Sequence, residues 1–143
     1  MDSIGQTERA TQNRVLALFR DDLGYSPLGD WTKRHGNSNI EESLLTAYLT
    51  KAGYSPQQIG RALHLLRIEA HNPNRSLYDN NRAVYGLLRY GVPVKMEAGK
   101  VTESVKLIDW AQPRSNDFAI AEEVTLRDGL NGYERRPDLV LYI

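Results

Sequence analysis

An aspartate that opens the last apolar segment is the residue best placed to do chemistry. Asp138 follows Pro137 and leads the run LVLYI, residues 139–143. A run rich in β-branched and aromatic residues after a proline predicts a buried strand, with Asp138 on the same face as Val140 and Tyr142. A carboxylate at the start of such a strand is costly unless it is paired, solvated at the sheet edge or bound to a metal.

Asp138 therefore has two interpretations. One is a salt bridge with Arg135 or Arg136. The other is a metal ligand, because Mg²⁺ held by carboxylates can polarise a phosphoryl oxygen and lower the pKa of the attacking water when a phosphodiester is hydrolysed. One aspartate does not suffice for that chemistry.

The first predicted helix offers a second acidic candidate. The pattern predicts a helix that starts at residue 6 or 7 and ends near residue 22. Its apolar stripe consists of Val15, Leu16 and Phe19. At about 100° per residue, Glu8 and Gln12 fall on the side of that stripe, so both are expected to point inward near the helix start. An inward carboxylate needs a reason, and Gln12 is an equal candidate for the same position.

The remaining elements must position these residues. A loop with a short strand around Trp31 is predicted for residues 25–39, and a second helix for residues 40–52. Ser55 and Ser76 are predicted caps of a third and a fourth helix, the fourth ending at Gly91. Strands are predicted from there on, including residues 118–126 and 139–143. Helices first and strands after predict an α+β fold, a helical layer packed on a mainly antiparallel or mixed sheet.

Composition excludes several classes of protein. The chain has 143 residues, 41% hydrophobic and 25% charged, which is typical of one globular domain over residues 1–143. Zero cysteines exclude disulfides and thiolate zinc sites. No apolar run has the length of a membrane span and no secretory signal is recognisable, so we expect a cytoplasmic protein. No motif for binding ATP or NAD is present.

Basic residues are concentrated in the predicted helical block of residues 51–94. That block contains six Lys or Arg residues against Glu69 and Asp79, although the whole chain has a net charge of zero. A solvated helical face is one interpretation, and a nucleic-acid footprint is the other. The tyrosines of the block, such as Tyr78 and Tyr85, have a spacing that is more typical of helix packing than of base stacking.

Long strings of this sequence resemble a known family. The strings are IEESLLTAYLTKAGYSPQQI, NPNRSLYDNNRAVYGLLRYGVPVKMEAGK, VKLIDW, NDFAIAEEVTL and RRPDLVLYI. Together they resemble the N-terminal region of the restriction (R) subunit of type I restriction-modification enzymes, over nearly the whole chain.

The resemblance implies a nuclease of the PD-(D/E)xK kind, with an incomplete core in this chain. In such nucleases an aspartate on one strand and a Glu-x-Lys pair on the next surround Mg²⁺ and the scissile phosphate. Pro137 and Asp138 match the first half of this motif, with Asp138 as metal ligand, and Glu8 is a candidate for the acidic helix residue that some of these nucleases use. The basic block then becomes a surface for duplex DNA, with Arg61, Arg67, Arg75 and Arg82 as candidate phosphate contacts.

The resemblance also implies what the 143 residues do not carry. Only residues 139–143 follow Asp138, so the strand with the Glu-x-Lys pair is absent. We therefore expect a segment that ends inside its active site, does not cleave DNA alone, and leaves a strand edge that could pair with another copy. The ATP-driven motor and the contacts with the methylation and specificity subunits belong to the rest of the family's R chain, so ATP is not bound by this segment.

Three functions are compatible with these patterns. The first is the endonuclease segment of a type I restriction enzyme. The second is a non-catalytic module that binds DNA or partner subunits, which would explain the basic block without catalysis. The third is an intact small α+β protein, which the ending of the chain on a strand disfavours.

Overall fold

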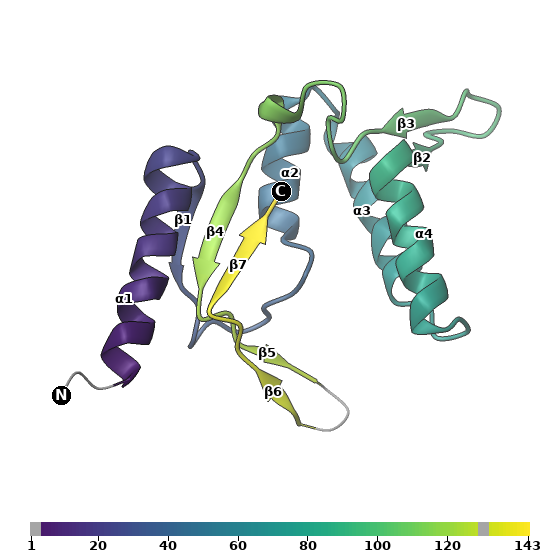
Figure 1. Ribbon diagram of the computed structural model, residues 1–143. Helices are drawn as coiled ribbons and strands as arrows, with labels where there is room; N and C mark the ends of the chain where they lie inside the picture. Colours follow the sequence, from purple (N-terminus) through teal and green to yellow (C-terminus); the bar gives the residue numbers. More distant parts are fainter. Residues whose placement is uncertain (1–3, 129–131) are drawn as a thin grey trace. The chain divides into compact units, whose positions relative to one another are not determined.

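The protein forms two compact units, which we describe separately. The computed structural model describes residues 4–128 and 132–143, with side chains from residue 8 onward in the first helix. The terminal unit comprises Met1–Glu41 and Asp117–Ile143, and the middle unit comprises Glu42–Asn116. Helices and small mixed or antiparallel sheets make up the fold, so the α+β prediction is confirmed (Figure 1). That residues 1–143 form a single nuclease-like domain stays a prediction.

The terminal unit begins with the predicted helix. Helix α1 (Ile4–Ala17) continues into a π-helical turn η1 (Leu18–Asp22), so the helix ends where the sequence predicts. The next residues bring the chain back along a new strand, β1 (Ser26–Asp30). The rings of Phe19 and Tyr25 pack edge to face with centroids 5.0 Å apart, which fixes this reversal.

Strands β1, β4 (Ala119–Glu122) and β7 (Leu139–Tyr142) form a mixed sheet with β4 in the centre. Strand β1 is parallel to β4, and β7 is antiparallel to β4 (Figure 1). The central strand carries the core of the unit, because Ile120 and Ala121 have no exposed surface. Burial of β4 on both faces explains its continuous apolar run.

The predicted strand over residues 118–126 is divided into two. Strand β4 ends at Glu122, and β5 (Leu126–Arg127) pairs with β6 (Glu134–Arg135) in a separate hairpin. The break lies at Glu123, which has a φ of 51°, a left-handed conformation that no continuous strand can contain. The tip of the hairpin, residues 129–131, lies outside the described residues.

The last strand is less buried than the sequence predicts. Leu141 is 45% exposed, and Ile143 just beyond β7 is 69% exposed. The physical reason is position, because β7 pairs with β4 alone within the described chain and so lies at the edge of the sheet. An edge strand presents unpaired backbone groups, which pairing with a second copy of the chain would need. That pairing itself stays a prediction.

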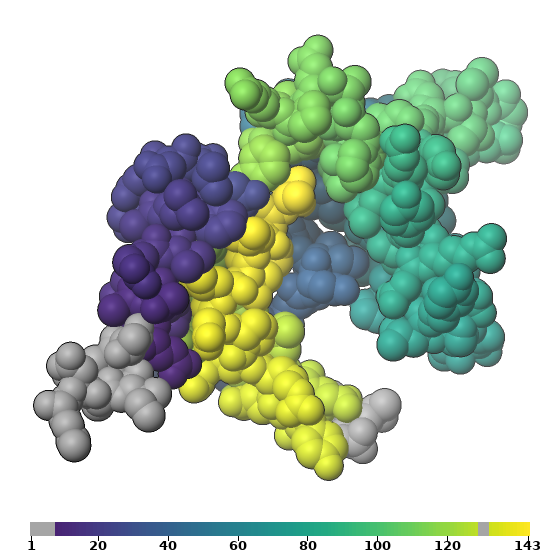
Figure 2. All heavy atoms as spheres, viewed as in Figure 1, coloured from purple at the N-terminus to yellow at the C-terminus, as the bar shows by residue number. Residues whose placement is uncertain are grey.

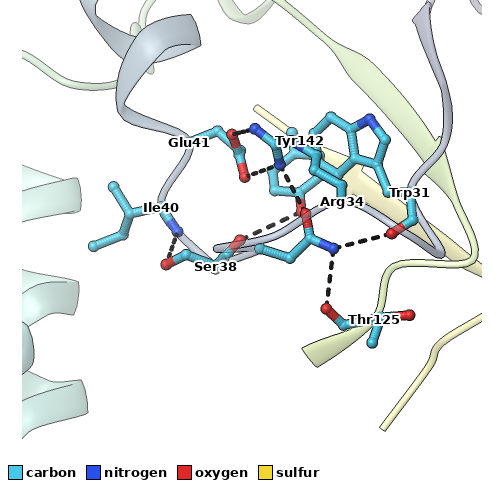
Figure 3. A network of polar contacts seen from close by, with 8 residues as sticks. Trp31, Arg34, Ser38, Ile40, Glu41, Thr125 and Tyr142 are labelled. Atoms are coloured by element: carbon cyan, nitrogen blue, oxygen red, sulfur yellow. Dashed lines mark hydrogen bonds and ion pairs between the residues drawn. The ribbon is translucent and has the colours of Figure 1, made fainter. Parts of the chain in front are cut away.

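A polar network holds the loop after β1, residues 31–41, against the three-stranded sheet (Figure 3). Both guanidinium Nη atoms of Arg34 donate to Glu41 at 2.9 Å, and the guanidinium lies 3.8 Å from the ring centroid of Trp31. The Tyr142 hydroxyl donates to the carbonyl of Ser38 at 3.4 Å. Burial, and then the charge of Glu41, raise the pKa of Tyr142 above its ordinary value.

The middle unit contains the other helices. It consists of α2 (Glu42–Lys51), α3 (Pro56–Ala70), α4 (Leu77–Tyr90), β2 (Val92–Val94), β3 (Glu103–Val105) and η2 (Pro113–Ser115). Helix α3 packs against α2, α4 and the β2–β3 hairpin, and its residues Ile59, Ala62, Leu63 and Leu66 are buried. Gly91 ends α4 with a φ of 91°, and a Cβ at this position would overlap the Ser104 hydroxyl.

The cap of α3 gives a testable stability contribution. Ser55 Oγ accepts from the Gln58 amide at 3.2 Å, and Gln58 Oε1 accepts from the Ser55 amide at 2.8 Å, a complete capping box. Ser55→Ala should lower the free energy of unfolding by about 1 kcal/mol, because helix-end amides lose their acceptor. Urea titration followed by circular dichroism measures this loss. Ser43→Ala, at an exposed serine inside α2, is the matched control, and an equal effect of both variants would contradict the capping role.

Candidate active site

Asp138 lies at the start of β7 with its side chain exposed to solvent. Within the described residues its carboxylate makes neither a hydrogen bond nor an ion pair. The alternative of a salt bridge with Arg135 or Arg136 is therefore wrong, because Arg136 is turned to another acid and its Nε lies 3.1 Å from Glu123 Oε2. Asp138 is thus a carboxylate that remains available to a ligand.

The backbone of Asp138 is held by a strained turn at the end of β4. The Glu123 amide donates to the Asp138 carbonyl at 2.9 Å, and the Val124 amide donates to the Pro137 carbonyl at 3.1 Å. Glu123 adopts its left-handed conformation at this point, which costs on the order of 1 kcal/mol for a residue with a Cβ. These two hydrogen bonds extend the pairing of β4 to Pro137 and Asp138, which lie just ahead of β7. They therefore fix the backbone position of Asp138.

Acidic residues gather at one end of the three-stranded sheet. Asp30, the last residue of β1, is the register partner of Glu122, and Glu122 is the partner of Leu139 on β7. Asp30, Glu122, Glu123 and Asp138 therefore occupy the adjacent ends of three strands. The pKa of Asp30 is lowered, first because the Thr32 hydroxyl donates to it at 2.6 Å and the Thr32 amide at 2.8 Å.

Two arginines accompany these acids. Arg9 on α1 has Nη atoms 3.8 Å from Glu122 Oε1 and 3.9 Å from Glu123 Oε1, and Arg136 pairs with Glu123 from the other side. Both arginine side chains are about half exposed, so each pair contributes under about 1 kcal/mol. Glu122 Oε1 is buried without a hydrogen-bond donor in the described structure. Its nearest cation is too distant for a hydrogen bond, which leaves an underused acceptor at this end of the sheet.

Helix α1 contributes Gln12 to the cluster. Gln12 is buried, and its Nε2 lies 3.3 Å from Glu123 Oε1 and 3.4 Å from the Asp138 carbonyl, so it can donate to both. Glu8 is exposed, and the prediction that it points inward is wrong. Gln12 lies level with the sheet end formed by the end of β4 and the start of β7. Glu8 lies one helical turn, about 6 Å, closer to the start of α1, and therefore beyond the sheet. Of the two equal candidates, the structure brings only Gln12 to Asp138.

A comparison with known families decides what kind of protein contains this site. The family model of the type I restriction enzyme R protein N terminus matches residues 5–143. The chain belongs to this family. The resemblance stated from the quoted strings is therefore confirmed. No curated protein and no solved structure gives a significant match to the chain.

No helix among the described residues of this R protein N terminus is long and apolar enough to cross a membrane. The family places the chain in a type I restriction system, whose R protein belongs to a restriction-modification complex that acts on DNA.

Asp138 of the R protein N terminus offers an exposed carboxylate of the kind that binds Mg²⁺. Glu122 has a buried oxygen without a hydrogen-bond donor, but its register partner is Leu139 rather than Asp138. Carboxylate oxygens are the ligands that Mg²⁺ takes, often one or two from protein and the others from water and substrate phosphate. Within residues 4–128 and 132–143, however, no group of three or more acidic or histidine side chains could hold a metal ion by itself.

Most of the candidate DNA-binding arginines of the R protein N terminus contact their own unit. Arg67 Nε lies 2.8 Å from Glu42, and Arg75 Nη2 lies 2.6 Å from Glu69. Arg61 donates to the carbonyl of Lys95. Arg82 is exposed and has no ion pair in the described part of the chain. Contact of the four arginines with DNA stays a prediction, and three of them have structural partners that would compete with phosphate.

Proposed function

We propose that this R protein N terminus carries the first half of a Mg²⁺-dependent nuclease site that cleaves foreign duplex DNA within the restriction complex. The observation that supports this most directly is the Asp138 carboxylate, which is exposed and unpaired in the described structure, while Asp30 and Glu123 at the same end of the sheet have partners. Family membership supports DNA as the substrate, and the exposed carboxylate supports metal-dependent hydrolysis as the chemistry.

In this proposal each residue of the cluster has a separate task. Asp138 would hold the metal ion through its carboxylate, and the chemistry supplied by such an ion would be polarisation of the scissile phosphate and activation of water. Gln12 and Glu123 hold the backbone of Asp138 through its carbonyl. Arg9 and Arg136 balance the charge of Glu122 and Glu123, so that Asp138 does not add its charge to an uncompensated acidic cluster.

The second half of the site must come from residues that this sequence does not contain. No Glu-x-Lys or Asp-x-Lys occurs in the 143 residues. A lysine beside the metal would stabilise charge that develops on the phosphate. We therefore propose that the 143-residue polypeptide alone does not nick plasmid DNA in Mg²⁺, and that ATP is used by a motor elsewhere in the parent chain.

The nucleotide sequence after the codon for Ile143 tests the proposal directly. A turn and one further strand should encode a Glu-x-Lys or Asp-x-Lys within roughly thirty codons, because strands and their connections are short. A reading frame that continues for that length without such a pair would overturn the nuclease proposal.

A non-catalytic module is the second candidate. It is favoured by the observation that the described residues contain no group of three or more acidic or histidine side chains that could hold a metal ion. Such a module would bind DNA in a salt-sensitive manner without Mg²⁺, and Arg61→Ala with Arg67→Ala should weaken that binding similarly on all sequences.

The role of Gln12 yields a prediction about metal dependence. In the assembled restriction complex, Gln12→Ala should raise the Mg²⁺ concentration for half-maximal cleavage by about fivefold, since one of the two donors to the Asp138 carbonyl is lost. Titration of Mg²⁺ during plasmid cleavage measures this shift. Asn13→Ala, an exposed amide on the same helix, is the matched control. The same Mg²⁺ dependence in both variants would contradict a positioning role.

A further inference from the structure

One face of α4 combines aromatic and basic side chains that stay exposed. Tyr78, Arg82, Tyr85 and Arg89 follow one another at intervals of four, three and four residues, which places them in one line along the helix. We call these four residues the α4 stripe. Tyr78 is 73% exposed and Tyr85 is 61% exposed. Side chains of the α4 segment, coloured teal, project from the surface in Figure 2.

The exposure of the tyrosines overturns the packing interpretation of their spacing. Helix α4 packs through its opposite face, where Asn80 is buried and donates to the Asn72 carbonyl at 3.1 Å. Val84 and Leu87 lie on that same inner side and are partly buried. The helix therefore has its core contacts without Tyr78 and Tyr85, and two large rings remain in solvent.

The charge of the α4 stripe is positive. Arg82 and Arg89 have no ion pair within the described residues, unlike Arg67 and Arg75 of the same unit. The acidic residue of the helix, Asp79, lies about 100° around from Tyr78 and accepts from the hydroxyl of its cap, Ser76, at 2.9 Å. An anionic ligand along the stripe would meet two guanidinium groups that form no ion pair within the described residues, with Asp79 beside the stripe already accepting from Ser76.

A fixed indole extends the stripe at its C-terminal end. The Arg89 guanidinium lies 5.5 Å from the ring centroid of Trp110 and 5.8 Å from that of Tyr90. The Trp110 indole N–H donates to the Leu88 carbonyl at 2.8 Å, which holds the ring in place, and half of the residue is exposed. The surface thus alternates ring and cation from Tyr78 to Trp110.

This alternation matches one class of ligand better than others. A duplex keeps the faces of its bases stacked on one another, so it would leave the exposed rings without a stacking partner. Protein interfaces also use tyrosine and arginine, but their buried centre is depleted in charged residues, whereas the α4 stripe separates its rings with cations. Unpaired bases stack on aromatic rings while arginines contact the phosphates between them. The eleven-residue interval from Tyr78 to Arg89 spans about 16 Å, the length of a short single-stranded segment.

We propose that the α4 stripe binds single-stranded nucleic acid by stacking bases on Tyr78 and Tyr85 and pairing phosphates with Arg82 and Arg89. This binding goes beyond the proposed cleavage and is independent of it. Asp138→Ala, which removes the proposed metal ligand, should bind the single strand as the native chain does.

Fluorescence anisotropy of a labelled oligothymidylate of about 12 nucleotides tests the proposal with the 143-residue chain. The double variant Tyr78→Ala/Tyr85→Ala should lose about tenfold or more in affinity, because each stacked base contributes strongly to binding. Tyr78→Phe/Tyr85→Phe keeps the rings and should stay within about threefold of the native chain. Tyr133→Ala is the matched control, since Tyr133 is 66% exposed but belongs to the terminal unit.

Three results would overturn the proposal. The first is equal affinity for a duplex of the same length together with no loss in the tyrosine-to-alanine variant, which would indicate backbone electrostatics alone. The second is the same loss in the phenylalanine variant. The third is no binding of either nucleic acid by a chain whose circular dichroism is helical; binding to the methylation or specificity subunits through the stripe would then identify a protein interface. Arg82→Ala should in addition reduce the salt dependence of single-strand binding by about 0.7 in slope.

Discussion

Asp138→Asn should abolish DNA cleavage by the R protein when it is assembled in its restriction-modification complex. Asparagine keeps the size and shape of the side chain but removes the charge with which a carboxylate binds Mg²⁺. Metal activation contributes several kcal/mol to lowering the barrier, so the loss should be about a thousandfold or more. Conversion of supercoiled plasmid to open-circular and linear forms in Mg²⁺ and ATP measures it.

Two controls separate this loss from misfolding. The Asp138 carboxylate has no partner in the described structure, so Asp138→Asn should change the free energy of unfolding by less than about 0.5 kcal/mol. Asp22→Asn, at another exposed aspartate of the terminal unit, should cleave at the native rate. Cleavage that survives Asp138→Asn in a folded subunit would remove Asp138 from the site and leave the non-catalytic module as the better proposal.

The middle unit was the more predictable part of the fold, because its signals are local. Ser55 and Ser76 cap the helices that follow them, and Gly91 ends the last one with a positive φ, as the sequence predicts. Each of these signals acts within one turn of the chain. What local signals could not predict was the outer face of α4, since tyrosines at helical spacing fit a packed face and an exposed face equally well.

The terminal unit was less predictable, because its structure depends on distant pairing. Strand β1 has the sequence SPLGD, with no alternation and a proline at an edge position, and it exists through its backbone pairing with β4 about ninety residues later. The division of residues 118–126 at Glu123 has the same origin, since only the pairing with the chain ahead of β7 favours a left-handed glutamate.

The candidate site shows the same division between local and distant information. Asp138 was identified because the sequence itself shows a charged residue at the start of an apolar run, where burial of the charge would be costly. Asp30, Glu122 and Glu123 were missed, because only the strand order places them at one end of the sheet. Helical periodicity found Gln12 and Glu8 together, but the periodicity gives the side of a helix and not how far along it the sheet extends.

The largest stability effect is expected at the network that fastens the loop to the end of β7. Arg34→Ala should lower the free energy of unfolding by roughly 2–3 kcal/mol, because it leaves the Glu41 carboxylate, whose side chain is 8% exposed, without its bidentate partner. We expect a smaller loss of unfolding free energy than for a fully buried ion pair, because the Arg34 side chain is 37% exposed. Lost stacking on Trp31 adds to it. Chemical denaturation of the 143-residue chain measures the change.

A double-mutant cycle with Glu41→Ala identifies the cause. Glu41→Ala leaves a guanidinium that can reach water, so it should cost less than Arg34→Ala, and the double variant should cost less than the sum. The two single variants should also shift the pKa of Tyr142 in opposite directions, upward without Arg34 and downward without Glu41, as ultraviolet absorbance can follow. Because a raised pKa favours the neutral phenol in the folded state, the stability that this shift contributes is lost as the pH rises through the folded-state pKa of Tyr142. Equal costs for both single variants, with additive effects, would show that the loop is held by its other contacts and not by a buried carboxylate that needs its cation.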